Sequence, residues 1–520
     1  MRQPDILFIV LDTQRADRLG CYGAAGDPRP RSLTPNLDAF AAQGATFEQA
    51  VAPAQWTIPS HASMFTGLYP TAHQVTQSSQ SLSHDGPHLV EALCAAGYQT
   101  IGFCNNPLVG VLNNGFKRGF DRFYNYGGAF PSTPESSARL PRPFGQLLEA
   151  YTQFLRRLSY PIQNFFGRSD LAFRVSLNPW LTPLWSNFAH FKGQNERSVR
   201  DLGELVRRRE AGRDAGRPLF LFLNLMETHL PFWPPGDFVA RHAPTLLESR
   251  EARDALRRWN REAGRWGAPL AEPFSDLEAG VLNGMYDAEV AYQDDYLGAL
   301  FQLLAGRARA ADTLTLIVAD HGEGLGEHGY FGHAFVAYQE LVHVPLILHW
   351  PGRIAAGGRV QTPVSTRRVY HTLLAAAGAS AELRSLSLLE EVAGHAVEAG
   401  RVLSEVFPPL NFLRAVQHRQ PELLERFRCL ATRRAFYEDG LKLVEVDGAA
   451  EELYALAADP LEQENVVAQR PAEVAGLEAT LRALLRTAEA QREGFSAGAG
   501  VAAPAEESLL RRLRGLGYIE

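Results

Sequence analysis

Three short apolar runs stand out in the hydrophobic pattern of the chain, and polar residues follow each of them. The runs hold few polar positions, which is typical of strands covered by helices on both faces. They occupy residues 6–11, 218–225 and 313–319. Asp12, His229 and the pair Asp320-His321 come directly or shortly after them. Sites in an open α/β sheet lie beyond the carboxyl ends of its strands, so we expect these side chains to meet there.

Helical patterns lie between the runs. Residues 34–43 open with Thr-Pro, and residues 289–304 carry apolar side chains at helical spacing. This alternation predicts an α/β fold, with a mainly parallel sheet sandwiched by helices. Later segments are shorter, and Asp439-Gly440 is typical of a hairpin turn. We therefore expect a small C-terminal antiparallel sheet with a helix over residues 472–490.

Chain length and changes in composition predict the domain boundaries. A chain of 520 residues exceeds one compact core. We predict a catalytic domain over residues 1–380, a small α+β subdomain over 381–493, and a linker and tail over 494–520. Residues 128–216 mix aromatic and arginine side chains. We expect a helical insertion there, and the alternatives are a lid over the site and a surface that touches lipid.

Charge and cysteine content argue against some classes of protein. The formal net charge of -7 provides no overall basic field, which argues against nucleic acid as the main partner. The cysteines show no metal-ligand spacing, and we expect buried, reduced thiols at Cys21, Cys94, Cys104 and Cys429. The N-terminal apolar run is about a third of the roughly 20 residues that a spanning helix needs. We therefore predict a cytoplasmic protein, with peripheral membrane contact as an open alternative.

The polar residues that follow two of the apolar runs predict a metal site. Asp320 and His321 would place a hard carboxylate and an imidazole at the mouth of a buried strand, and Gly322 lets the backbone turn away. Asp12 reaches the same edge if its strand is a neighbour. A structural turn at Asp320-His321-Gly322 and a helix cap at Asp12 are the competing interpretations.

Thr57 is the candidate nucleophile. Pro59 at the first position of a helix predicts that Thr57 lies just before that helix, where free N–H groups and the helix dipole favour an anionic oxygen. A threonine hydroxyl bound to a divalent cation there would lose its proton more readily and attack an ester. Ordinary helix capping by Thr57 or Ser60 is the alternative.

A series of motifs resembles the signatures of the sulfatase family, part of the alkaline phosphatase superfamily. These motifs are residues 12–23, 34–38, 57–67, 286–289 with Asp294, 320–329, 344–347, and Glu452-Leu453-Tyr454 with Asp459-Pro460 and Asn465. They cover most of the chain outside residues 128–216. The resemblance implies an alkaline-phosphatase-like fold and a metal-dependent hydrolase of ester bonds. It also implies that Asp12, Asp320 and His321 are metal ligands and that Thr57 is both the nucleophile and a metal contact.

The resemblance further implies residues that bind or protonate the substrate. His229 matches the family's substrate-binding or acid histidine, and His333 stands where many members have a lysine that contacts the anion. Asn105 or Asn106 falls where sulfatases often carry another such lysine. Arg15 would help to orient the metal ligands or the anion.

Departures from the family pattern change the expected chemistry. Sulfatases convert the first residue of a Cys/Ser-x-Pro-x-Arg motif to formylglycine, but Thr57 and His61 stand at its two ends here. Threonine cannot supply that aldehyde, so we expect a covalent phospho- or sulfo-ester that water hydrolyses. Thr13 replaces the second of two paired aspartates common in calcium-binding sulfatases. A single Mn²⁺, Zn²⁺ or Mg²⁺ ion is therefore favoured, and Ca²⁺ is the least favoured.

The main hypothesis is a hydrolase of sulfate or phosphate esters, including phosphodiesters, whose substrate is a small molecule or a glycan- or lipid-linked ester. In this hypothesis Thr57 attacks sulfur or phosphorus, and His229 or His333 protonates the leaving alcohol. One alternative is a transferase of phosphoalcohol groups such as phosphoethanolamine or phosphoglycerol. The other is a non-catalytic protein that keeps the fold.

Overall fold

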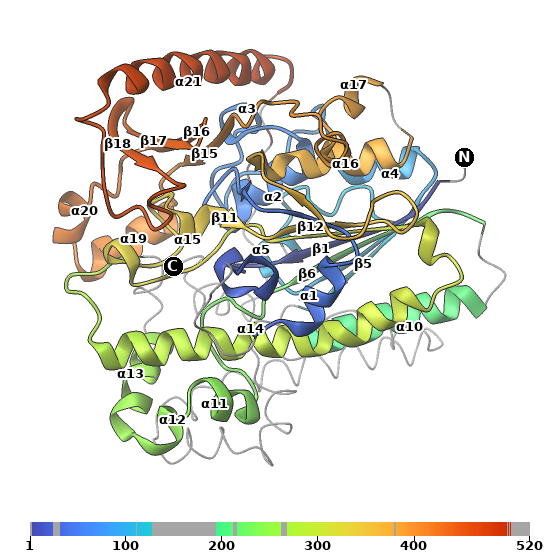
Figure 1. The fold of residues 1–520 in the computed structure, drawn as a ribbon, viewed down its shortest axis with the longest axis horizontal. Helices are drawn as coiled ribbons and strands as arrows, with labels where there is room; N and C mark the ends of the chain where they lie inside the picture. Colours follow the sequence, from blue (N-terminus) through green and yellow to red (C-terminus); the bar gives the residue numbers. More distant parts are fainter. Residues whose placement is uncertain are drawn as a thin grey trace.

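A sheet of eight strands runs through the centre of the molecule, between two layers of helices (Figure 1). The computed structural model describes residues 3–23, 32–110, 112–126, 194–211, 216–261, 268–378, 381–496, 498 and 500. In order across the sheet, the strands are β13 (Gly358–Val360), β2 (Ala45–Phe47), β12 (Leu346–His349), β8 (Thr313–Val318), β1 (Asp5–Leu11), β6 (Leu219–Leu225), β4 (Gln99–Cys104) and β5 (Arg122–Asn125). Within this described sheet only β12 runs antiparallel to its neighbours. The predicted mainly parallel α/β fold is confirmed.

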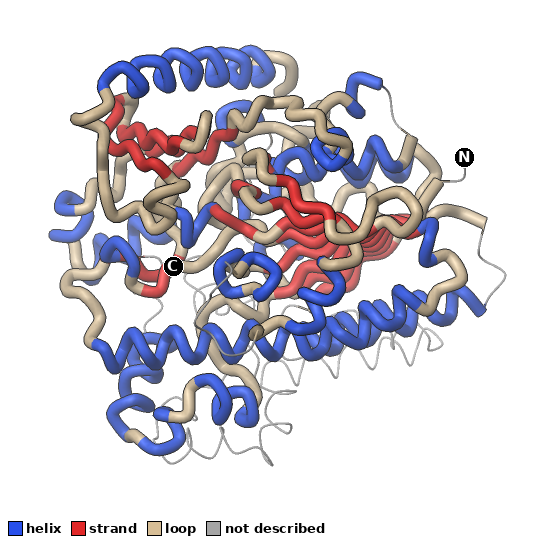
Figure 2. The backbone as a smooth tube through the Cα atoms, viewed as in Figure 1, coloured by secondary structure: helices blue, strands red, loops and turns tan. Residues whose placement is uncertain are grey.

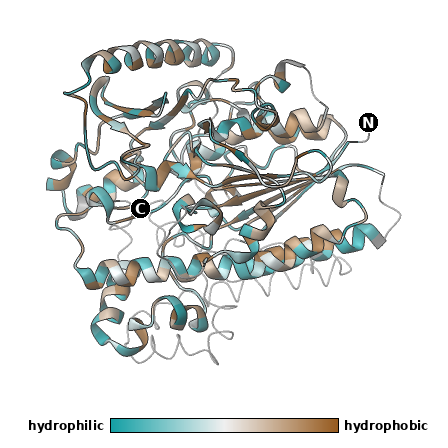
Figure 3. Cartoon of the chain, viewed as in Figure 1, coloured by the Kyte–Doolittle hydropathy of each residue, from teal (hydrophilic) through white to brown (hydrophobic). Residues whose placement is uncertain are grey.

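The three apolar runs form neighbouring strands in the middle of this sheet. β1 pairs in parallel with β8 on one side and with β6 on the other. Every residue of these three strands is buried. In Figure 3 the strands of the large sheet are coloured mainly as hydrophobic. Because the three strands are parallel neighbours, the residues that follow them emerge at one edge of the sheet.

Helices cover both faces of the sheet. The layer below the sheet in Figure 1 contains α1 (Pro35–Ala41), α10 (Asn195–Ala211) and α14 (Asp276–Ala305), with α11 (Gly236–His242), α12 (Thr245–Glu248) and α13 (Arg250–Arg261) beyond them. The opposite layer contains α2 (Thr57–Thr66), α3 (Pro70–His73), α4 (Leu89–Ala95), α5 (Pro107–Gly110) and α16 (Val369–Ala376). A capping box of Ser275 and Glu278 starts α14, well before the predicted start at residue 289.

Two small sheets extend the sheet edge where the polar residues emerge. One consists of β7 (Ala268–Pro269), β10 (Tyr330–Gly332) and β9 (Gly324–Leu325). The other consists of β11 (His343–Val344), β3 (Ala50–Val51) and β14 (Val364–Ser365). The β9–β10 hairpin matters most for the site, because Glu323 precedes it and His333 follows it.

A separate antiparallel sheet forms near the C-terminus, as predicted (Figure 2). Its strands are β15 (Val402–Val406), β16 (Arg433–Glu438), β17 (Leu441–Val446) and β18 (Ala449–Ala455), and α21 (Pro471–Arg492) packs across them. Asp439 and Gly440 form the predicted turn between β16 and β17, with φ angles of 50° and 74°. The expected hairpin and C-terminal helix are therefore confirmed.

The remaining shorter helices lie after β10 in the chain. α15 (Gln339–Val342), α19 (Leu410–Arg419) and α20 (Glu422–Arg426) lie on the side of the small sheet. By contrast, α17 (Ala381–Arg384) and α18 (Leu388–Val392) pack against α16.

Several sequence predictions concern residues outside the described part of the chain. Of the expected insertion at 128–216, residues 128–193 and 212–215 lie outside it, while α10 packs on α14 and the sheet. Most of the predicted linker and tail over 494–520 also lies outside it. All four cysteines are free, but Cys21 and Cys94 are partly exposed rather than buried. Among the described helices, none is long and apolar enough to cross a membrane.

Candidate active site

Asp12, Asp320 and His321 converge at the carboxyl ends of β1 and β8. His321 Nε2 lies 3.9 Å from Asp12 Oδ1 and 3.5 Å from Asp320 Oδ2, and all three side chains are fully buried. One ligand atom from each residue lies within 4.8 Å of the other two. The structure therefore brings together the three residues predicted as metal ligands, because their strands pair directly.

The donor atoms of this cluster suit a divalent cation. Asp12 Oδ1 accepts no hydrogen bond from the described residues, although it is buried. The N–H groups of Thr13 and His321 hold only one oxygen of Asp320, Oδ1, at 3.3 and 3.0 Å. His321 Nδ1 lies 2.9 Å from Gly322 O, to which it donates, so the lone pair of Nε2 faces the carboxylates. Two carboxylates and one imidazole are ligands typical of manganese or zinc.

Electrostatics in the cluster also favour a cation. Burial and the charge of Asp320 raise the pKa of Asp12 well above its usual range. Burial lowers the pKa of His321 to about 4, so at neutral pH the ring is uncharged, the form that binds metals. Two carboxylates this close repel each other unless a positive charge lies between them. A bound cation would offset that repulsion.

Thr57 is the first residue of α2 and lies beside this cluster. Its Oγ1 is 3.3 Å from His321 Nε2 and 3.5 Å from Asn106 Nδ2. The residue before the helix is Trp56, and Thr57 does not cap α2 through its side chain. The sequence predicted Pro59 as the first residue of this helix. The helix begins two residues earlier, at Thr57, so Pro59 is its third residue. Ser60 Oγ donates to Asp320 O at 2.6 Å, so it ties α2 to β8 instead of capping the helix.

Thr13 adopts a backbone conformation that is rare for a β-branched residue. Its φ of 58° lies in the left-handed region, which costs about 1–3 kcal/mol. Its hydroxyl donates to Asp12 O at 2.7 Å and lies 3.1 Å from Thr228 Oγ1, away from the carboxylates. Thr13 therefore contributes its N–H group to Asp320, and its side chain adds no ligand to the cluster.

His333 and His229 lie next to the cluster. The centroid of the His333 ring is 4.5 Å from that of His321 and 4.9 Å from that of His229. His333 Nδ1 lies 2.8 Å from Glu323 Oε1, and Nε2 has no hydrogen-bond partner among the described residues. Burial lowers the pKa of His333 to about 4 and that of His229 to about 3, and raises the pKa of Glu323 to about 7.

The structure separates the two asparagines that the sequence left as alternatives. Asn106 Nδ2 donates to Asp12 Oδ2 at 2.5 Å and faces Thr57. Asn105 Nδ2 instead donates to Ser198 Oγ and Asn224 O, both at 2.9 Å. Asn106 therefore lies in the cluster, and Asn105 supports the backbone behind it.

Arg15 is held by acidic side chains. Its guanidinium forms ion pairs with Asp17 at 2.8 Å and Glu327 at 2.7 Å, and Nη1 also donates to Glu323 O at 3.2 Å. Its predicted contact with the substrate anion stays a prediction.

Sequence reasoning gave no role to three residues that line or support the cluster. Glu323 was visible as the residue after Asp320-His321-Gly322, but nothing in the sequence paired it with His333 across the β9–β10 hairpin. Asn224 was visible as the one polar side chain in an otherwise apolar run. His61 was noted only as a departure from a motif.

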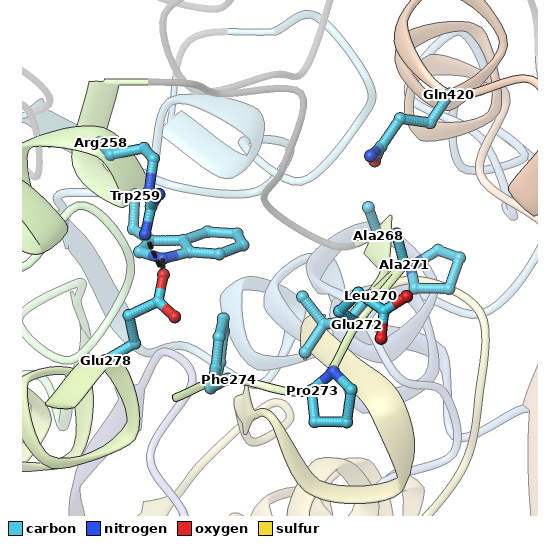
Figure 4. Close-up of a pocket in the computed structure, with 11 residues that line it drawn as sticks. Arg258, Trp259, Ala268, Leu270, Ala271, Glu272, Pro273, Phe274, Glu278 and Gln420 are labelled. Atoms are coloured by element: carbon cyan, nitrogen blue, oxygen red, sulfur yellow. Dashed lines mark hydrogen bonds and ion pairs between the residues drawn. The ribbon is translucent and has the colours of Figure 1, made fainter. Parts of the chain in front are cut away.

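A separate pocket of about 230 Å³ opens beside the β7–β10 pair (Figure 4). Trp259 and Phe274 form one wall, and Gln420 lies across the cavity from them. Glu278 is fixed there by Arg258 and by Trp259 Nε1, the latter at 3.0 Å. Among the described residues that line this pocket, none belongs to the Thr57 site.

Two models of known protein families match most of the chain. The family model described as Sulfatase matches residues 4–379. A second model, described as N-sulphoglucosamine sulphohydrolase, C-terminal, matches residues 326–491.

Curated proteins and solved structures match at low identity over most of their length. The chain is 24% identical over 473 residues to the uncharacterized sulfatase YidJ of Escherichia coli K12, covering 90% of this chain and 84% of that protein. It is 25% identical over 391 residues to the multifunctional alkaline phosphatase superfamily protein PehA of Trinickia caryophylli, covering 69% and 71%. The phosphonate monoester hydrolase of Agrobacterium radiobacter superposes with a TM-score of 0.64 at 21% identity, covering 94% of this chain and 96% of that chain. The structural match shows a shared fold.

Proposed function

Because the chain belongs to the sulfatase family of ester hydrolases, we propose that it cleaves sulfate or phosphate esters with Thr57 as the nucleophile. The observation that carries this proposal is the position of Thr57 Oγ1, at the start of α2 and 3.3 Å from His321 Nε2. A hydroxyl in that position lies next to the buried carboxylates and at the positive end of a helix dipole. The helix dipole favours its deprotonated form, and a cation held by the carboxylates would offset their repulsion of the alkoxide.

The residues that would hold a divalent cation are Asp12, Asp320, His321 and Thr57. When bound, the cation supplies charge that lowers the pKa of the threonine hydroxyl and neutralises the ester oxygens. The lack of a second carboxylate at Thr13 favours manganese, zinc or magnesium over calcium.

In the proposed reaction, Thr57 Oγ1 loses its proton to solvent and forms a bond to sulfur or phosphorus. The bond to the alcohol oxygen breaks, and that oxygen takes a proton from His333 Nε2. Glu323 accepts a hydrogen bond from Nδ1 of the same ring and so favours its protonated form. Asn106 would donate to an oxygen of the transferring group. Water then cleaves the Thr57 ester and releases the sulfate or phosphate product.

Replacing the nucleophile tests this proposal. We expect the Thr57→Ala protein to fold and bind Mn²⁺ but to lose essentially all hydrolysis of nitrophenyl sulfate, nitrophenyl phosphate and a nitrophenyl phosphodiester. The parent protein should hydrolyse at least one of these with Mn²⁺, Zn²⁺ or Mg²⁺, and the preferred ester would identify the substrate class.

A threonine at the other end of the same helix provides a matched control. Thr66 Oγ1 donates to Ala62 O at 2.7 Å and does not contact the cluster. Thr66→Ala should change the rate by no more than about twofold, since it touches no reacting group. Undiminished activity in Thr57→Ala would contradict the proposed nucleophile.

A further inference from the structure

His61 is a fully buried polar side chain to which the proposed reaction gives no role. It lies one turn after Thr57 on α2, where the family motif has arginine. Its Nδ1 is 3.0 Å from Thr57 O and 3.3 Å from Asp320 Oδ2. One ring nitrogen therefore contacts both the residue that carries the nucleophile and a carboxylate of the metal site.

The surroundings of His61 fix which ring nitrogen carries hydrogen. Asn224 Oδ1 accepts the N–H group of Asn106 at 3.0 Å, so the amide NH₂ of Asn224 points the other way. That NH₂ group lies 3.4 Å from His61 Nε2. Nε2 is therefore the acceptor, and Nδ1 carries the hydrogen that it donates to Thr57 O, with Asp320 Oδ2 near the same nitrogen.

We infer that His61 is a positioning residue that sets the metal affinity of the Asp12, Asp320 and His321 cluster. Asp320 Oδ1 is already held by two backbone N–H groups, from Thr13 and His321. The other oxygen, Oδ2, accepts no hydrogen bond from the described residues, lies 3.5 Å from His321 Nε2, and has the Nδ1–H group of His61 beside it at 3.3 Å, an electrostatic contact. The same ring restrains the first turn of α2, so the ligand carboxylate and Thr57 keep a fixed separation. This inference rests on the metal site of the proposed function.

A purely structural role for His61 would be to fill space. Its ring lies 6.4 Å from that of Phe65 and 6.1 Å from that of Phe116, between centroids. The two roles make different predictions, because space filling depends on side-chain size whereas positioning depends on where the N–H group lies.

Asparagine and glutamine at position 61 separate these roles. The side-chain NH₂ of asparagine falls near the place of histidine Nδ1, and that of glutamine falls nearer to Nε2. We expect His61→Asn to bind Mn²⁺ and Zn²⁺ within about threefold of the parent, and His61→Gln and His61→Phe to bind them about 10–100-fold more weakly. Titration calorimetry of the full chain with the metal salt alone measures this.

Another buried histidine controls for the loss of a ring. His73 ends α3 and lies 3.0 Å from Ser63 Oγ, away from Asp320. His73→Asn should leave metal affinity unchanged. Equal affinity in the Asn and Gln variants at position 61, or parental affinity in the Phe variant, would overturn the inference. If His61→Phe fails to fold, the difference in metal affinity between His61→Asn and His61→Gln still distinguishes positioning from space filling.

The readout is metal binding and not hydrolysis, so the two proposals fail separately. A parent protein that binds metal with the expected Asn and Gln difference, yet cleaves no ester, would contradict the proposed function alone. A parent that cleaves esters while the Asn and Gln variants bind metal equally would contradict only the role of His61.

Discussion

Among the described residues, one hydrogen bond, between its Nδ1 and Glu323, orients His333. The proposed role of this ring, protonation of the leaving group, can be tested apart from that of the nucleophile. Burial lowers its pKa to about 4, and a bound sulfate or phosphate group would favour the protonated ring again. We expect His333→Ala to slow cleavage of alkyl esters by about 10²–10⁴-fold, because an alkoxide needs a proton to leave. Nitrophenyl esters should be affected far less, since nitrophenolate leaves without one.

Steady-state rates for a matched pair of alkyl and nitrophenyl esters measure this difference. Glu323→Gln keeps a hydrogen-bond acceptor for Nδ1 but removes the negative charge. We therefore expect its rate of alkyl-ester cleavage to lie between those of the parent and His333→Ala. Equal losses for both esters in His333→Ala would contradict a role in protonating the leaving group.

At the residue scale, the sequence could predict which residues gather at the carboxyl ends of the strands. It could not predict which of their side-chain atoms form hydrogen bonds with one another. Asn105 and Asn106 are equivalent in sequence, and the turn after β4 decides that only Asn106 faces Asp12. His333 follows Glu323 by ten positions, and only the β9–β10 hairpin brings them within 2.8 Å. Such contacts depend on local backbone geometry that the side-chain pattern does not encode.

At the scale of elements, the central strands were predictable because both of their faces are buried. The first half of α14 was not predicted, since Gly280 and Gly284 interrupt the helical pattern there. A Cβ atom on Gly284 would lie 2.6 Å from His242 O, so glycine permits α11 to pack closely on α14. The antiparallel direction of β12 likewise depends on tertiary pairing with β8 and β2.

Two exposed glycines show how the same substitution has opposite effects in different elements. Gly440, in the β16–β17 turn, has a φ of 74°, and Gly476 lies inside α21; a Cβ atom would meet nothing at either position. We expect Gly440→Ala to lower the free energy of unfolding by roughly 1–2 kcal/mol, because alanine is strained in the left-handed region. Gly476→Ala should raise it by about 0.5–1 kcal/mol through helix propensity.

Urea unfolding of both variants measures these two changes. A stabilising Gly440→Ala would contradict the assigned turn geometry, and a destabilising Gly476→Ala would contradict the helical state of α21 at that position.

At the scale of the whole molecule, the C-terminal sheet borders the loop that follows His333. Arg433 Nη1 donates to Phe335 O at 3.0 Å, and Lys442 Nζ donates to Ala337 O at 2.6 Å. The ring of Phe412 in α19 lies 5.9 Å from that of His333, between centroids. The small sheet therefore supports the edge of the large sheet where His333 lies, although its strands come last in the chain.

The buried ion pair of Lys442 and Glu462 is central to this junction. Both side chains are fully buried, and Glu462 Oε2 also accepts the N–H group of Gln339 at 2.6 Å. Burial raises the pKa of Glu462, and the charge of Lys442 opposes that rise. We expect Lys442→Met to lower the free energy of unfolding by about 3–5 kcal/mol, because it leaves a carboxylate buried without its partner. The double variant Lys442→Met with Glu462→Leu should recover most of that loss, since it buries no unpaired charge.

Chemical denaturation at neutral pH measures both variants, with an exposed ion pair as the control. Arg482 and Glu478 lie 3.0 Å apart on α21, and the Arg482 side chain is 58% exposed. Arg482→Met should change stability by less than about 1 kcal/mol, since solvent already screens that pair. If the double variant were as unstable as Lys442→Met alone, the loss would come from the shape of the junction and not from its charge. The hydrogen bond from Lys442 to Ala337 O and the one from the Gln339 N–H group to Glu462 would then be the dominant contacts between the small sheet and the His333 loop.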